Sequence, residues 1–182
     1  PFRKQFAQFE DKIGEYAGSK VVNPIASFPA MVQRLDGDVG RLVDLLDELG
    51  LTGDTLIVFT SDNGPHLEGG HDPEFFNSNG PYRGFKRDLY EGGIRMPTIA
   101  CWPGKIANGS ESEFASAGWD WFPTLCELAG ATPPAGLDGV SIVPSLTATG
   151  EQTANEYLYW EFHDKGGRQA VRRGPWKAVR YN

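Results

Sequence analysis

The stretch Thr55-Leu56-Ile57-Val58-Phe59-Thr60, followed directly by Ser61-Asp62-Asn63-Gly64, decides the fold class. The first six residues form a β-rich run without alternation between polar and apolar positions. A strand that is buried on both faces has this pattern, as in a parallel or mixed sheet flanked by helices. In open α/β sheets, ligands bind beyond the carboxyl ends of the strands. In this chain, residues 61–64 follow the carboxyl end of the predicted strand. The sequence therefore predicts an α/β fold with a candidate site directly after this strand.

A helix is predicted immediately before the strand, between Pro29 and Leu49. Apolar residues recur there at helical spacing, and the charged residues lie mostly on the other face. The apolar positions are Val32, Leu35, Val39, Leu42, Val43, Leu46 and Leu49. Pro29 suits a first helical turn, and Gly50 suits a C-terminal cap. A helix, a short loop and a buried strand together make an α/β unit.

The rest of the chain predicts part of a mixed sheet flanked by helices, followed by the start of a small antiparallel sheet. Residues 1–27 show no clean period, so we expect a short helix and then a long surface loop there. The later elements are expected to be a long loop at 64–97, a strand at 98–102, a helix at 119–129, a strand at 157–162, and a hairpin of 169–173 with 176–180 that turns at Gly174-Pro175. A loop as long as 64–97 within a compact domain is usually functional.

Composition and charge exclude some classes of protein. The 182 residues suffice for one domain with a core, and the net charge of −7 argues against a nucleic-acid partner. No apolar run is long enough to span a membrane as a helix. The chain opens at Pro1 without a start methionine and ends abruptly at Asn182, so we expect it to be a piece of a larger parent protein. Cys101 and Cys126 each lie in an apolar stretch, so we expect small buried side chains, and a disulfide between them stays open.

Asp62 and Asn63 are candidate metal ligands. A carboxylate beside an amide carbonyl, held at the end of a rigid strand, offers two oxygens to a hard cation. Calcium takes six to eight oxygens and magnesium six, so these two side chains would be only part of a shell. Asp-Asn-Gly is also an excellent turn sequence, and the dipeptide alone leaves both readings open.

The segment from Arg83 to Pro97 is a candidate anion site. It places several cations around Gly92-Gly93, a pair that permits unusual backbone angles. Lys86 can hold an anionic oxygen as a point charge, whereas an arginine binds one through its planar fork. The competing interpretation is a surface network of weak ion pairs. We expect that interpretation to hold for Glu91 and Arg95, which are four residues apart.

Three motifs in order, Thr60–Pro65, Gly84–Lys86 and Tyr90–Pro97, closely resemble the second half of the sulfatase family. Further matches before and after them extend the resemblance to about residues 30–182. The resemblance implies the arylsulfatase-like fold of the alkaline phosphatase superfamily. It also implies that residues 1–148 are the C-terminal part of the catalytic α/β domain. Residues 149–182 would then begin a small C-terminal antiparallel subdomain.

The resemblance also implies roles for single residues. The family's metal-ligating Asp-Asn pair falls on Asp62 and Asn63, with calcium as the expected cation in preference to magnesium. The lysine that contacts the substrate's sulfate falls on Lys86. His66 is close enough to the metal pair to line the pocket and touch substrate, although an ordinary loop histidine is the competing interpretation. The expected partner of the parent is a sulfated small molecule or a sulfated carbohydrate, and a periplasmic or secreted parent is suspected.

No catalytic residue is assigned within this chain. The sulfatase nucleophile is a formylglycine made from cysteine in a C-x-P-x-R or C-x-A-x-R context. Cys101 is followed by Trp-Pro-Gly-Lys, which matches only the proline, and Cys126 does not match. We therefore expect a parent that hydrolyses sulfate esters, and an isolated chain that is inactive.

Two other interpretations stay open: a fragment of a related phosphodiesterase or phosphonate hydrolase, and a non-catalytic module.

If the central sheet of the parent is split, the strand at 55–60 exposes an edge and an apolar face. Either self-association of the chain or a reliance on the missing part of the parent is then expected.

Overall fold

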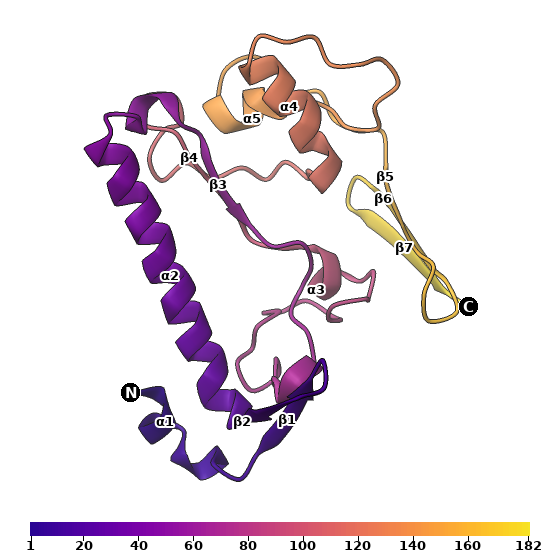
Figure 1. Cartoon of the computed structure of the whole chain (residues 1–182). Coiled ribbons are helices and arrows are strands. Elements are labelled where there is room, and N and C mark those ends of the chain that lie inside the picture. Colours follow the sequence, from indigo (N-terminus) through magenta and orange to yellow (C-terminus); the bar gives the residue numbers. More distant parts are fainter. The chain divides into compact units, whose positions relative to one another are not determined.

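The computed structural model describes all residues 1–182, and it confirms the predicted α/β class (Figure 1). The chain divides into two compact units. The first contains residues 1–52 and 60–98, and the second contains residues 53–59 and 99–182. Each unit is described by itself. No helix is both long enough and apolar enough to cross a membrane.

A hairpin lies near the N-terminus, where the sequence suggested a long loop. After α1 (Phe2–Gln5) and η1 (Ala7–Phe9), strands β1 (Ile13–Tyr16) and β2 (Ser19–Val22) pair in antiparallel fashion. Ala17 and Gly18 connect them with positive φ angles of 48° and 77°, which suits a two-residue hairpin turn. The loop expectation was wrong here because two four-residue strands are too short to show a period, and Gly14 and Gly18 interrupt the pattern although they belong to the hairpin and its turn.

The long helix α2 (Pro24–Glu48) begins five residues before the predicted start at Pro29. Asn23 caps it, because its side-chain oxygen accepts a hydrogen bond from the Ala26 amide at 3.0 Å. Pro29 lies inside the helix instead of in its first turn. The predicted end is confirmed: Gly50 has a φ of 67°, and its amide donates to the carbonyl of Asp47, as in a Schellman cap. A short η2 (Thr52–Asp54) follows.

Strand β3 (Ile57–Thr60) pairs with β4 (Thr98–Cys101) in a two-stranded sheet. Both strands were predicted, each slightly too long. The expected burial on both faces is wrong for this chain, because the Phe59 side chain is 39% exposed and Ile99 is 62% exposed. Between the strands lie mostly turns, with η3 (Glu68–Gly70) and α3 (Glu91–Ile94) as the only regular segments.

The second unit is organised around the fully buried carboxylate of Asp120, which ends η4 (Gly118–Asp120) and precedes α4 (Trp121–Leu128). Asp120 accepts hydrogen bonds from the amides of Ala117 and Val140 at 2.7 and 2.9 Å. The side-chain amide of Asn155 donates to the same carboxylate at 3.3 Å. One carboxylate therefore ties three segments together. The helix α5 (Val143–Thr147) was not predicted.

The C-terminal sheet matches the prediction closely. Its strands β5 (Leu158–Phe162), β6 (Arg168–Arg173) and β7 (Trp176–Tyr181) are antiparallel in the order β5-β6-β7. Arg173 pairs with Trp176 across the predicted turn at Gly174-Pro175. Leu158 and Ala170 are its buried apolar side chains.

Candidate functional site

The turn that carries Asp62 and Asn63 is hydrogen-bonded to helix α3. The amide of Gly64 donates to the carbonyl of Gly93 at 2.8 Å. The two backbones approach so closely that a Cβ atom at Gly64 would collide with the carbonyl oxygen of Gly92. Glycine at position 64 is therefore a requirement of this approach and not only of a turn.

A second backbone hydrogen bond brings Lys86 to the same place. The amide of Lys86 donates to the carbonyl of Pro65 at 2.7 Å. We call this bond and the one from Gly64 to Gly93 the two clamp hydrogen bonds. Together they join the turn after β3 to residues 83–95, so the candidate metal pair and the candidate anion-binding lysine belong to one locally connected structure.

The metal pair presents oxygen atoms. The Ser61 hydroxyl donates to the Asn63 carbonyl at 2.9 Å, and the side-chain amide nitrogen of Asn63 donates to the Gly64 carbonyl at 3.0 Å. The side-chain oxygen of Asn63 accepts no hydrogen bond, and the Asp62 side chain is exposed. A carboxylate and a free amide oxygen suit a hard cation such as calcium. Nowhere in the chain do three or more His, Cys, Asp or Glu side chains gather around a possible ion, so this pair supplies only part of a shell.

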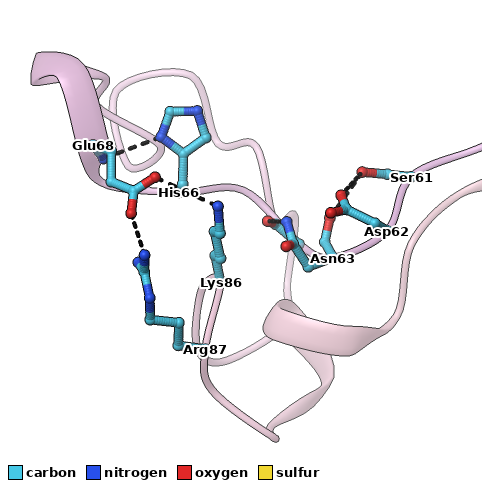
Figure 2. Close-up of polar contacts among 8 residues, drawn as sticks. Ser61, Asp62, Asn63, His66, Glu68, Lys86 and Arg87 are labelled. Carbon is cyan, nitrogen blue, oxygen red and sulfur yellow. Dashed lines mark hydrogen bonds and ion pairs between the residues drawn. The ribbon is translucent and has the colours of Figure 1, made fainter. Parts of the chain in front are cut away.

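Lys86 belongs to a cluster of three charged side chains, in which Arg87 is the second basic residue and Glu68 is the acidic one. The Lys86 ammonium lies 3.4 Å from one carboxylate oxygen of Glu68, and the guanidinium of Arg87 contacts the other oxygen (Figure 2). The hydrogen bond from Arg87 is the main cause that lowers the pKa of Glu68; burial opposes it, and the charges of Arg87 and Lys86 add to the lowering. Glu68 therefore stays ionised between its two cations.

The sequence reasoning missed Glu68. Its ionic partners are 18 and 19 residues away along the chain, and a single acid in a glycine-rich loop carries no periodic signal. The one available clue was local: two adjacent cations, Lys86 and Arg87, need a counter-ion when they are partly buried.

His66 is held in one orientation by the backbone of Glu68. The Glu68 amide donates to Nδ1 of His66 at 3.0 Å (Figure 2). A neutral imidazole that accepts at Nδ1 carries its proton on Nε2, so His66 presents a hydrogen-bond donor at Nε2. Such a donor can bind an anionic oxygen.

His71 has a different environment. Its ring centroid lies 4.1 Å from that of Phe28, it stacks on Phe76 at 5.7 Å, and both ring nitrogens are buried without a partner. Burial lowers the pKa of His71, as does the nearby His66, while Asp72 acts in the opposite direction. His71 is therefore a neutral ring within an aromatic cluster and no source of protons at neutral pH.

The other candidate cations of this segment, Arg83 and Arg95, contact residues that are close to them in the sequence. Arg95 lies 3.8 Å from Glu91, which confirms the expected ion pair, and its guanidinium also covers the ring of Tyr82 at 4.7 Å. Arg83 lies over the ring of Tyr90 at 3.9 Å. These contacts leave Lys86 and Arg87, balanced by Glu68, as the cations of the candidate anion site.

The cysteines take no part in this site. Both are free thiols, so the open question of a disulfide is answered in the negative. Cys101 is exposed on β4, which corrects the expectation that it is buried, because this face of β4 is uncovered in the chain. Cys126 is partly buried in α4.

Comparison with known proteins gives consistent matches. The sulfatase family model matches residues 1–131. Steryl-sulfatase of Rattus norvegicus is 38% identical over 149 residues, which is 80% of this chain and 25% of that protein. Arylsulfatase A of Homo sapiens is 36% identical over 187 residues, which is 98% of this chain and 35% of that protein. The chain thus spans a quarter to a third of the length of these relatives.

Solved structures give the same pattern. The structure of Ps i-CgsB in complex with k-i-k-neocarrahexaose matches with a TM-score of 0.75 and 32% identity, over 86% of this chain and 34% of that one. BT4656 in complex with its substrate D-glucosamine-2-N,6-O-disulfate matches with a TM-score of 0.70 and 27% identity, over 87% and 31%. A phosphonate monoester hydrolase of Agrobacterium radiobacter shares the fold, with a TM-score of 0.64 and 22% identity over 98% and 39%.

Proposed function

Because this chain belongs to the sulfatase family, we propose that it carries part of the metal- and sulfate-binding site of a sulfate-ester hydrolase. The observation that carries the proposal is the pair of clamp hydrogen bonds. They bring the oxygen ligands of Asp62 and Asn63 and the ammonium group of Lys86 into one local structure. A metal ligand and an anion ligand that act on the same sulfate group need such an arrangement.

Each residue has a distinct role in the proposal. The Asp62 carboxylate and the side-chain oxygen of Asn63 hold a divalent cation, with calcium favoured over magnesium because calcium accepts more protein oxygens in a flexible shell. When bound, the cation neutralises negative charge on sulfate oxygens. Lys86 binds a sulfate oxygen through its ammonium group, and the Nε2 proton of His66 offers a further donor.

The nucleophile, a formylglycine, is proposed to lie in the rest of the parent protein, since neither Cys101 nor Cys126 has the required sequence context. The 182-residue chain by itself should therefore not turn over sulfate esters. We further propose that residues 1–148 belong to the catalytic domain and residues 149–182 to a smaller antiparallel subdomain, whose strands β5–β7 lie within the second range.

The proposed substrate class is a sulfated small molecule or a sulfated carbohydrate. The names of the relatives support this class: they include steryl-sulfatase and arylsulfatase A, and one solved neighbour was bound to a disulfated glucosamine. Phosphonate monoester hydrolysis is the runner-up. Sulfate is preferred because the sulfatase family model matches residues 1–131 and the sulfatase relatives are 36–40% identical to this chain, whereas the phosphonate monoester hydrolases, at 22–23% identity, share only the fold.

Titration of the 182-residue chain tests the proposal. Phenyl sulfate should shift the amide NMR signals of Gly64 and Lys86, and Lys86→Met should weaken its binding about tenfold or more, because a charged hydrogen bond is lost. Calcium should bind at about millimolar concentration through this part of a shell, and Asp62→Asn should weaken that binding further. Shifts confined to other parts of the chain, or an unchanged affinity in the Lys86 variant, would overturn the assignment.

A further inference from the structure

We propose that Glu68 sets the charge of the anion site so that it favours singly charged esters over doubly charged phosphate monoesters. The inference rests on the proposed function, because it takes Lys86 as the residue that binds the ester's anionic group. It assigns to Glu68 a role in specificity, in addition to the role of Lys86 in binding.

The geometry makes Glu68 a shared counter-ion. Its two carboxylate oxygens contact two different cations: one lies 3.4 Å from the Lys86 ammonium, and the other meets the Arg87 guanidinium. Lys86 and Arg87 contribute two positive charges and Glu68 removes one, so these three side chains together carry a charge of about +1 at neutral pH. The lowered pKa of Glu68 keeps that balance in place.

The charge of the ligand decides what this balance means. A sulfate monoester carries a single negative charge, and so do phosphodiesters and phosphonate monoesters. A phosphate monoester carries close to two negative charges above its second pKa of about 6. In the chain without a bound metal ion, the net charge of about +1 on these three side chains balances only one of the two charges, and the Glu68 carboxylate repels the other. Because all three side chains are partly exposed, solvent screens the penalty, and we expect a discrimination of roughly three- to tenfold.

The substitution Glu68→Gln removes the negative charge of the side chain without removing the backbone contact of residue 68. The Glu68 backbone amide, which orients His66 through Nδ1, is unchanged by the substitution. Glu74→Gln is the matched control, because it removes the same charge from an exposed residue that forms no ion pair in the same loop. Arg87→Met provides a change of opposite sign, since it leaves Glu68 opposite Lys86 alone.

The test compares dissociation constants of phenyl sulfate and phenyl phosphate for the 182-residue chain, measured by NMR at about pH 8, where the phosphate is doubly charged. In Glu68→Gln, the ratio of the phosphate constant to the sulfate constant should fall roughly three- to tenfold. In Arg87→Met the ratio should rise, and in Glu74→Gln it should stay within about twofold of the native value. At about pH 5 the effect of Glu68→Gln should disappear, because the phosphate is then singly charged.

Each contrary result overturns the inference. Phenyl sulfate could bind at Lys86 while Glu68→Gln changes the ratio of the two dissociation constants no more than Glu74→Gln does. That result would support the proposed function and contradict the role of Glu68. If neither ester perturbs Lys86 in the native chain, both fall together. If Glu68→Gln does not fold, Arg87→Met decides, because an unchanged or lowered ratio in that variant contradicts the charge balance.

Discussion

At the residue scale, Gly64 sets how closely the turn that carries Asp62 and Asn63 approaches helix α3. Gly64→Ala places a methyl group against the carbonyl of Gly92, so we expect a loss of about 1–3 kcal/mol in the free energy of unfolding. Gly37→Ala is the matched control, since no atom lies near its Cβ position within α2, and it should stabilise the chain by about 0.5–1 kcal/mol. Chemical denaturation of the two variants checks both signs. Equal effects would show that the close approach does not exist in solution.

His71 gives a second prediction at this scale, concerning pH. Burial lowers its pKa in the folded chain below the usual value near 6.5, so the unfolded chain takes up a proton that the folded chain resists. The free energy of unfolding should therefore decrease as the pH falls below about 6.5, and this term should be constant above it. His71→Phe, which keeps an aromatic ring against Phe28 and Phe76, should flatten that slope.

Thermal melting of the native chain and of His71→Phe between about pH 5 and 8 measures this difference. The control is His163→Gln, because the side chain of His163 is 88% exposed and contributes no buried ring. A slope that disappears in the control but persists in His71→Phe would contradict the assignment.

At the scale of elements, periodicity was informative where a segment forms its own pattern. The helix α2 and the strands β3 to β7 follow from apolar spacing and from turn residues that are close together in sequence. The start of α2 was misplaced because Pro29 looked like a first-turn proline, whereas the capping side chain of Asn23 defines the start. The β1–β2 hairpin was missed because Gly14 and Gly18 interrupt its short strands and turn.

For the candidate site, too, the sequence predicted the residues that lie in local motifs and missed the residue whose role depends on a distant contact. Asp62, Asn63 and Lys86 were identified from motifs, each of which is contiguous in sequence. Glu68 was not, because its role depends on a contact that only the folded loop creates. Burial was misjudged as well: β3 has the composition of a fully covered strand, but the chain does not cover it. The composition of a strand reflects the surfaces that cover it in the whole protein. A chain that spans only part of that protein need not contain those surfaces.

At the scale of the whole molecule, exposed apolar side chains are the dominant feature. Helix α2 exposes several large ones, and the sheet of β3 and β4 exposes Phe59 and Ile99. Those on α2 are Met31, Val32, Leu35, Leu42, Val43 and Leu45. Surfaces of this kind associate in water unless another chain segment covers them. We therefore expect the isolated chain to self-associate.

Sedimentation velocity over a range of concentrations tests this expectation. The average mass should rise with concentration, and Leu42→Glu, which places a charge among the exposed apolar side chains of α2, should reduce the rise. Asp44→Glu on the same helix preserves the charge and should leave it unchanged. A single monomeric species at every concentration, together with a cooperative melt, would show that the apolar side chains are covered within the monomer.

The two clamp hydrogen bonds also bear on how a site of this kind changes over evolutionary time. One of them, from the Lys86 amide to the Pro65 carbonyl, closes the loop between these two residues at its base. The entropy cost of closing a loop grows only slowly with its length. An insertion beside the exposed Asn77 and Ser78 should therefore leave the base of the loop closed. Such a loop can differ in length at its tip from one lineage to another without changing the donors and acceptors at its base.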